Sequence, residues 1–304
     1  MEYILTTNAI TKQYGKHKAV NAVSLHIRQG NIYGLIGRNG AGKTTLMKMI
    51  SGLARPTDGD FTLFGKTGKA KYEFMSRIGS LIEAPGVYPE LSAAENLKLK
   101  CLALGIRKEG FIRELLDITG LGDVGKKKVG KFSLGMKQRL GIALALVGEP
   151  DLLILDEPIN GLDPQGIAEV REIIFRLNKE KNITFMISSH ILEELSKVAT
   201  NYGIIHNGTL IQELTQAELL AKCKERIELK TDHPQKACTV IEAMGITNYK
   251  VMDADTIHIF ERLTESGNIT MELAKKDIRT LSISVRNEAL EDYYLNLTGG
   301  KGNV

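Results

Sequence analysis

One eight-residue stretch constrains this chain more than any other feature, because it dictates a backbone conformation and the structure on both sides. The stretch consists of Gly37, Arg38, Asn39, Gly40, Ala41, Gly42, Lys43 and Thr44. It follows the apolar run 31–36, which predicts a strand, and leads into residues 44–52, which predict a helix. Glycines allow the backbone to curl until successive N–H groups face one anion, and a helix N-terminus adds partial positive charge. The stretch therefore predicts a site for the phosphates of a nucleotide.

Side chains at the end of this stretch would complete the phosphate site. Lys43 is placed to reach the β- and γ-phosphates, and the Thr44 hydroxyl is placed to bind Mg²⁺. The adjacent Thr45 is placed to reach an inner phosphate. We therefore expect a nucleoside triphosphate with its divalent cation as the ligand.

A second candidate site follows the apolar run 152–155, which predicts a buried strand. Asp156 and Glu157 come directly after it, at the end of a strand where parallel sheets bind ligands. We expect Asp156 to hold Mg²⁺, directly or through water, and Glu157 to polarise an attacking water as general base. Pro158 ends the strand after this pair.

A third feature is the segment 132–139, in which Ser133 and Gly135 precede a predicted helix. A serine at an N-cap makes a second helix start that can receive an anion. A simple kinase or GTPase needs one such start. Two make sense if the second binds the γ-phosphate of a nucleotide held on another subunit. An ordinary capped helix is the alternative for this segment taken alone.

The pattern of predicted elements divides the chain into regions. Strands and helices alternate up to residue 215, as in a largely parallel, buried sheet, apart from an all-helical insert at about 85–148. Residues 222–304 follow the order βαββαβα, ending in a helix over 287–297, which resembles a small ferredoxin-like α+β domain. We therefore predict two domains, 1–215 and 222–304.

Composition excludes several classes of protein. No apolar run approaches the roughly 20 residues that a membrane-spanning helix needs, and the N-terminus does not read as a secretory signal. The three cysteines are far apart, which argues against a disulfide framework or a zinc site. Tryptophan is absent and the net charge is only +4, which argues against a dedicated nucleic-acid binder.

Motifs spaced along residues 1–215 together resemble the ATPase subunits of ABC transporters. In chain order they are Tyr14 as the adenine-stacking aromatic, 37–44 as Walker A, 132–136 as the LSGGQ signature, Asp156 and Glu157 as Walker B and its glutamate, 160–163 as the D-loop and His190 as the switch histidine. The resemblance implies an α/β fold: a P-loop ATPase core, with a mixed or parallel sheet flanked by helices, and a helical subdomain insert.

The resemblance also implies ATP and Mg²⁺ as cofactors and a role for each site residue. The catalytic residues would be Glu157, His190 and Lys43. The residues binding nucleotide would be Tyr14, Gly37, Arg38, Asn39, Gly40, Ala41, Gly42, Lys43, Thr44, Thr45, Ser133, Gly135 and Asp163. The metal ligands would be Thr44, Glu83 and Asp156.

Partners are implied as well. Two such subunits would close head to tail, with two ATP molecules between the Walker A motif of one and the signature of the other. Separate transmembrane permease subunits would be contacted through the region 83–97 and the helical insert, and no nucleic acid is expected. The chain would then lie peripherally at the cytoplasmic face of the cell membrane.

Two departures from the family's motifs narrow the resemblance to one subgroup. Glu83 stands where the family has the Q-loop glutamine, and the signature reads FSLGM instead of LSGGQ. These features, the phrases at 79–85, 130–140 and 187–192, and the ending at 290–300 resemble the ATPase subunits of bacitracin-resistance and lantibiotic-immunity exporters. Export of antimicrobial peptides or other antibiotics is the function this implies.

Other functions remain as alternatives. The main one is an ABC-type ATPase for DNA repair or chromosome handling, but these insert long coiled coils, and the interval from Walker A to the signature here is only about 90 residues without sustained heptads. A non-catalytic nucleotide-gated module and a small-molecule kinase each leave part of the motif set unexplained. Residues 222–304 contain no recognisable chemical site, so regulation, dimer support and docking are all open.

Overall fold

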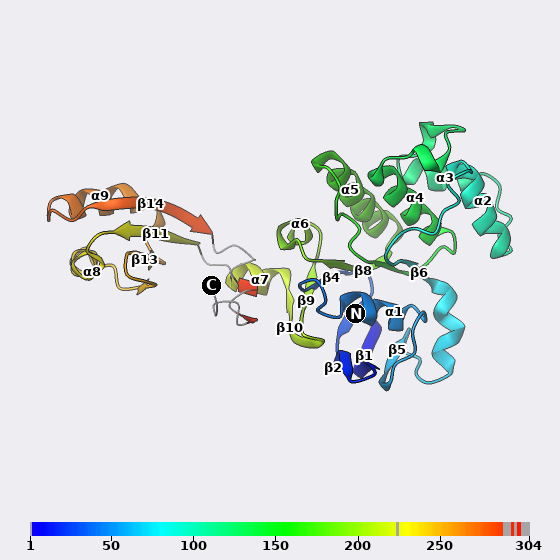
Figure 1. Ribbon diagram of the computed structural model, residues 1–304, viewed down its shortest axis with the longest axis horizontal. Coiled ribbons are helices and arrows are strands. Elements are labelled where there is room, and N and C mark those ends of the chain that lie inside the picture. The colour runs from blue at the N-terminus through cyan, green and yellow to red at the C-terminus, as the bar shows by residue number, and fades with distance from the viewer. Residues whose placement is uncertain (1, 223–224, 288–292, 295–296, 299–304) are drawn as a thin grey trace. The chain divides into compact units, whose positions relative to one another are not determined.

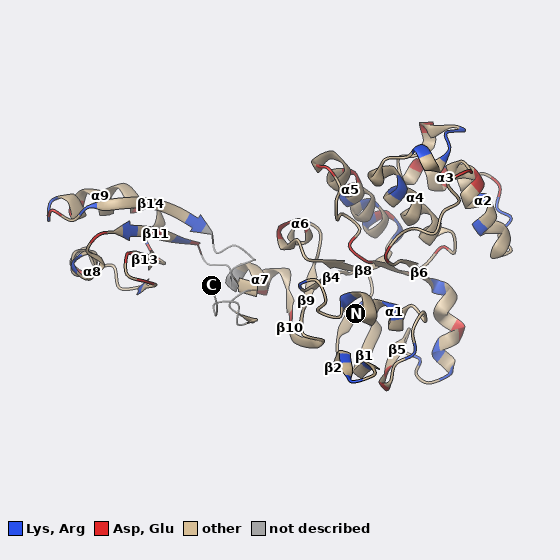
Figure 2. Cartoon of the chain, in the orientation of Figure 1, with Lys and Arg blue, Asp and Glu red and all other residues tan. Residues whose placement is uncertain are grey.

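The computed structural model describes residues 2–222, 225–287, 293–294 and 297–298. The chain forms two compact units, Met1–Gln216 and Ala217–Val304. Figure 2 shows both signs of charge spread over the elements of each unit. That the two units act as separate functional domains stays a prediction.

An antiparallel sheet opens the N-terminal unit. Its strands are β1 (Tyr3–Tyr14), β2 (His17–Val23), β3 (His26–Arg28) and β5 (Asp58–Leu63). Strand β1 pairs with the three others. Strand β1 continues through Ala9 to Tyr14, and β2 runs from His17 through Ala22 to Val23. Ala9 and Ala22 have φ values of 48° and 49°, and the register shifts between Ile10 and Gln13, so irregular pairing had hidden the alternation.

A six-stranded sheet forms the centre of the same unit. In spatial order its strands are β10 (Thr209–Thr215), β9 (Asn201–His206), β4 (Ile32–Ile36), β8 (Thr184–Ser189), β7 (Leu152–Leu155) and β6 (Ile78–Leu81). All neighbours are parallel except β10 and β9. Strands β4, β7 and β8 are buried along their whole length, as expected for a sheet covered on both faces. The carboxyl ends of β4, β6, β7 and β8 therefore meet at one edge.

Helices surround this sheet. They are α1 (Lys43–Ile50), α5 (Pro164–Lys181) and α6 (Leu192–Ser196), with α2 (Ala93–Ala103), α3 (Phe111–Ile118) and α4 (Leu134–Leu146) in the insert and the short turns η1 (Ala70–Arg77), η2 (Gly122–Val124) and η3 (Val129–Lys131). Figure 1 shows α2, α3 and α4 gathered at one end of the unit and the antiparallel strands at the other. The predicted architecture, a mostly parallel sheet flanked by helices with a helical insert, is confirmed.

Helix α4 packs directly on strand β6 because each element has a glycine at the point of contact. A Cβ atom on Gly79 would lie 2.2 Å from the carbonyl oxygen of Ala145. A Cβ atom on Gly141 would lie 2.9 Å from Leu81 and from Pro85. Only glycine permits this close approach, so the insert is joined to the central sheet by backbone contact.

The C-terminal unit is a small α+β fold. Helix α7 (Gln216–Lys222) leads into β11 (Glu225–Thr231), α8 (Pro234–Ala243), β12 (Tyr249–Val251), β13 (Thr256–Ile259), η4 (Leu263–Glu265), α9 (Ser266–Ala274) and β14 (Thr280–Asn287). Its antiparallel sheet has the order β12-β13-β11-β14, which confirms the ferredoxin-like prediction. Its core is aliphatic, with Ile227, Leu229, Ile257 and Ile259 fully buried. Most of the predicted helix at 287–297 lies outside the described residues.

The described residues contain no helix that combines the length and the apolar character needed to cross a membrane.

Candidate functional site

A cavity of about 370 Å³ opens at the carboxyl edge of the central sheet. It is lined by Tyr14, His17, Ala19, Arg38, Asn39, Gly40, Ala41, Gly42, Lys43, Thr44, Thr45 and Glu157. The structure thus brings Tyr14, from the end of β1, together with the predicted phosphate loop and Glu157. His17 belongs to the same cavity and was not predicted. It pairs with Tyr14 across the hairpin between β1 and β2, and that two-residue turn was the signal that could have revealed it.

Gly42 sets the conformation of the phosphate loop. Its φ is 104°, in the left-handed region, and it stands at the N-cap of α1. A Cβ atom there would lie 2.4 Å from the carbonyl oxygen of Ala19. Glycine is therefore required twice, by backbone angle and by space, and the N-terminal amides of α1 are left facing the cavity.

Lys43 is buried and held within its own loop. Its ammonium donates to the carbonyl oxygen of Gly37 at 2.6 Å and lies 3.0 Å from Oε1 of Glu157. Only 5% of the side chain is exposed, so the charge depends on these oxygens for its stabilisation. Phosphate oxygens of a bound nucleotide would take over the same role.

Asp156 joins the loop to the neighbouring strands. Its Oδ2 accepts a hydrogen bond from the Thr44 hydroxyl at 2.7 Å, and its Oδ1 accepts one from the Ser188 hydroxyl at 2.6 Å. The Ser188 hydroxyl also accepts from the backbone N–H of Glu157 at 2.8 Å. Ser188 was not predicted as a site residue. Its place at the end of β8, beside β7 in the sheet, was the available signal.

Glu157 lies between two other predicted residues. Its Oε1 faces Lys43, and its Oε2 lies 2.7 Å from Nδ1 of His190. The backbone of Glu157 has a φ of 49°, a strained value for a residue with a side chain. The structure therefore brings all three predicted catalytic residues into one chain of contacts.

Glu83 follows β6 but contacts α1 instead of Asp156. Its Oε1 lies 2.6 Å from Nζ of Lys48, and Glu83 is not among the described residues that line the cavity. The hydrogen bond to Glu83 raises the pKa of Lys48, with smaller electrostatic contributions from Glu83, Tyr14 and Asp156. The structure thus does not place Glu83 with Thr44 and Asp156, its two predicted fellow metal ligands.

Ser133, Gly135 and Asp163 form a separate group. Ser133 caps α4 by accepting from the Met136 N–H at 3.2 Å, and Asp163 caps α5 by accepting from the Gly166 N–H at 3.0 Å. A Cβ atom on Gly135 would lie 3.9 Å from Leu162, so the two helix starts are neighbours. None of the three is among the described residues that line the cavity. Within one chain, the predicted signature is therefore not brought to the phosphate loop.

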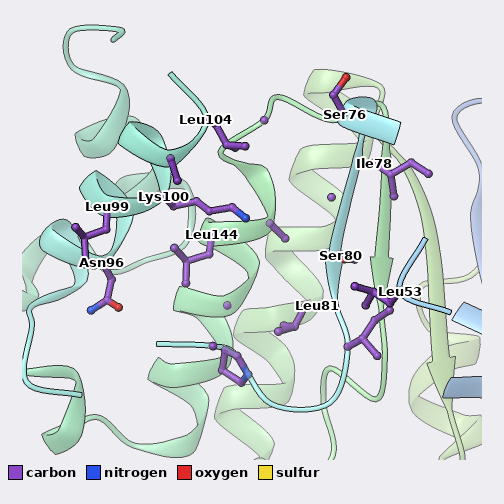
Figure 3. Close-up of a pocket in the computed structure, with 18 of the residues that line it drawn as sticks. Leu53, Ser76, Ile78, Ser80, Leu81, Asn96, Leu99, Lys100, Leu104 and Leu144 are labelled. Atoms are coloured by element: carbon purple, nitrogen blue, oxygen red, sulfur yellow. The ribbon is translucent and has the colours of Figure 1, made fainter. Parts of the chain in front are cut away.

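A second, larger hollow of about 810 Å³ lies between β6 and the insert. Figure 3 shows Leu53, Ile78 and Leu81 on one side, Leu99 and Leu104 on the other, and Lys100 extending from α2 toward α4 and β6. The segment from Ala84 to Tyr88 also contributes to its wall. We call this hollow the insert groove.

Comparisons with known proteins agree with this geometry. The sequence pattern of the family described as ABC transporter matches residues 20–160. Bacitracin transport ATP-binding protein BcrA of Bacillus licheniformis is 44% identical over 302 residues, which is 99% of each chain. Lantibiotic transport ATP-binding protein SrtF of Streptococcus pyogenes is 47% identical over 210 residues, covering 69% of this chain and 90% of the relative.

The similarity to solved structures covers a share of the chain that is close to the share formed by the N-terminal unit. An ATP-binding subunit of an ABC transporter is 30% identical with a TM-score of 0.63, and covers 72% of this chain and 92% of its own. The ADP conformation of an ATP-binding cassette of an ABC transporter has a TM-score of 0.65 at 24% identity. The match covers 73% of this chain and 96% of the solved chain. The latter likeness concerns the fold.

Proposed function

Because the chain belongs to the ATP-binding proteins of ABC transporters, and is thus a nucleotide-binding ATPase, we propose that it is the motor subunit of an exporter of peptide antibiotics. Two relatives that support this substrate class are named for bacitracin and lantibiotic transport. The match to BcrA extends over 99% of both chains and so includes the C-terminal unit. The alternative in DNA repair or chromosome handling is not favoured by these relatives.

The observation that carries the motor role is the position of Glu157 between Lys43 and His190. Water attacks the γ-phosphorus, Glu157 accepts a proton from it, and the bond to the ADP oxygen breaks to release phosphate. Lys43 neutralises the phosphate oxygens, and His190 orients the Glu157 carboxylate. Tyr14 stacks on the adenine from the far side of the same cavity.

Thr44 and Asp156 are suited to bind Mg²⁺. Their oxygens are 2.7 Å apart and are of the hard type that this ion prefers. No cluster of three His, Cys, Asp or Glu side chains suited to a metal occurs in the part of the chain that the structure describes. This fits an ion that takes one or two protein ligands and completes its shell with phosphate and water. When bound, it would neutralise charge on the phosphate oxygens.

The separation of Ser133 from the phosphate loop supports a head-to-tail dimer. Ser133 and Gly135 begin a helix that is exposed at its first turn, which is suited to an anion on another molecule. A mixing experiment tests this: Ser133→Arg and Lys43→Ala variants, each inactive alone, should together restore ATPase activity, since one composite site would be intact. Absence of any rescue would count against the arrangement.

The permease subunits would dock at the insert groove, at the cytoplasmic face of the membrane. The groove presents apolar side chains with a lysine among them, as an amphipathic helix of a partner requires.

Co-expression with a neighbouring permease in a sensitive bacterium tests the substrate class: it should raise the bacitracin or lantibiotic concentration that stops growth. Glu157→Gln is the matched control and should abolish the effect. Unchanged susceptibility with the wild-type pair would contradict the substrate class.

A further inference from the structure

Two residues on one face of α1 hold the acidic residues that follow two neighbouring strands. Thr44 and Lys48 are four positions apart, and therefore lie one above the other on the helix. Thr44 binds Asp156, which follows β7, and Lys48 binds Glu83, which follows β6 two residues later. The strands are parallel neighbours, and the N–H of Asp156 donates to the carbonyl oxygen of Leu81 at 2.8 Å. Lys48 thus occupies, toward Glu83, the position that Thr44 occupies toward Asp156.

The backbone of Glu83 is in the left-handed region. Its φ is 64°, which is costly for a residue with a side chain. Its side chain is 64% exposed, so packing does little to hold it. The ion pair to Lys48, at 2.6 Å, ties this strained position to the helix of the phosphate loop.

The segment that follows Glu83 forms part of the insert groove. Ala84, Pro85, Gly86 and Tyr88 all line it. Pro85 also lies against Gly141 of α4. Glu83 therefore lies between α1, which it contacts through Lys48, and the segment that forms one wall of the groove.

We propose that Lys48 is a positioning residue for Glu83: it holds the carboxylate on α1 while no nucleotide is bound, and competes for it with the divalent cation of the nucleotide. This rests on the proposed function, because it assumes that Thr44 and Asp156 bind that cation. The ammonium of Lys48 is a monovalent substitute for the cation, on the same helix face as Thr44. Binding of metal and nucleotide would release the groove wall, which links occupancy of the site to the docking surface.

The first test needs no nucleotide. Hydrogen exchange of the full-length, nucleotide-free protein should show amides 82–88 exchanging about two- to fivefold faster in Lys48→Met, the effect expected for a partly exposed ion pair. Lys48→Arg should restore protection. Lys181→Met is the matched control, since it removes a lysine from another exposed pair, with Glu114, and should leave 82–88 unchanged. Equal exchange in Lys48→Met and wild type would overturn the proposal.

The second test uses Mg²⁺ and a fluorescent ATP analogue. Lys48→Met should lower the Mg²⁺ concentration needed for half-maximal binding by about two- to fivefold, because the competitor for Glu83 is gone. In a Glu83→Gln background the same substitution should have no effect. An equal effect in both backgrounds would overturn the proposal, since Lys48 would then act without Glu83. If wild-type protein bound no ATP, the proposed function would fail instead, while the exchange test would stand.

Discussion

Both units of this chain have carboxylates after their strands, but in the N-terminal unit these belong to a candidate site and in the C-terminal unit they accept hydrogen bonds from nearby backbone amides. In the N-terminal unit, Asp156 and Glu157 follow a strand and meet Thr44, Lys43 and His190 at one edge. In the C-terminal unit, Asp253 accepts from the N–H of Asp255 within a turn, and Glu261 accepts from the N–H groups of Asn248 and Thr247.

Sheet topology explains the difference. Parallel strands end at the same edge, so residues far apart in sequence converge there and leave room for a ligand. Antiparallel strands end at alternate edges, and the polar residues there close turns between neighbours. In this chain, the carboxylates that converge with other polar side chains are therefore those that follow parallel strands.

The largest expected effect is that of Glu157→Gln. Loss of the general base should lower steady-state ATP hydrolysis by about 10²- to 10⁴-fold, while nucleotide binding remains because Lys43 and the loop are intact. Phosphate release and binding of a fluorescent ATP analogue measure the two properties. The variant should also accumulate as an ATP-bound dimer, visible by light scattering. Wild-type turnover would show that Glu157 is not the base.

A core substitution in each unit should separate stability from function. Ile257→Ala, in the buried core of the C-terminal unit, should lower the free energy of unfolding of that unit by about 2–5 kcal/mol through the cavity it leaves. Ile36→Ala, in the buried strand before the phosphate loop, should cost a similar amount but also weaken ATP binding. Denaturant unfolding and nucleotide titration report the two effects. Loss of ATP binding in Ile257→Ala would show that the C-terminal unit completes the site.

The smallest expected effect is that of Glu261→Gln, the C-terminal counterpart of the first substitution. Hydrogen bonds from the Asn248 and Thr247 amides hold the pKa of Glu261 below its usual value. The carboxylate therefore contributes stability above its unfolded pKa, and this contribution is lost as the pH falls through the lower, folded pKa. Thermal melting at neutral pH should show that Glu261→Gln destabilises the protein less than Ile257→Ala does. The destabilisation by Glu261→Gln should disappear in acid. ATP hydrolysis should not change. A fall in turnover would contradict the view that Glu261 serves only the C-terminal unit.

The sequence predicted best where local pattern and ligand chemistry coincide. Gly42 and Lys43 belong to the loop that follows one apolar strand, Asp156 follows another, and the structure brings the loop and Asp156 together. The ferredoxin-like order was also predictable, because each of its elements is short and bounded by turn residues. The predicted roles of the site residues stay predictions.

What the sequence could not supply depends on geometry between distant residues. The pairing of Lys48 with Glu83 joins positions 35 residues apart and leaves no local pattern. Ser188 could have been any buried strand hydroxyl until the register of β8 against β7 was known. The irregular pairing around Ala9 hid the path of β1 to Tyr14, because a bulge shifts the alternation that reveals a strand.

The contact between Gly79 and Ala145 has a mechanical consequence. No side chain lies between the two backbones at this point, so we expect α4 and β6 to move together. The helix is about 20 Å long, given 13 residues at a rise of about 1.5 Å each. Ser133 stands at the N-terminal end of this helix, and Gly141 lies against Leu81 and Pro85. A displacement of β6 would therefore be carried along α4 to Ser133.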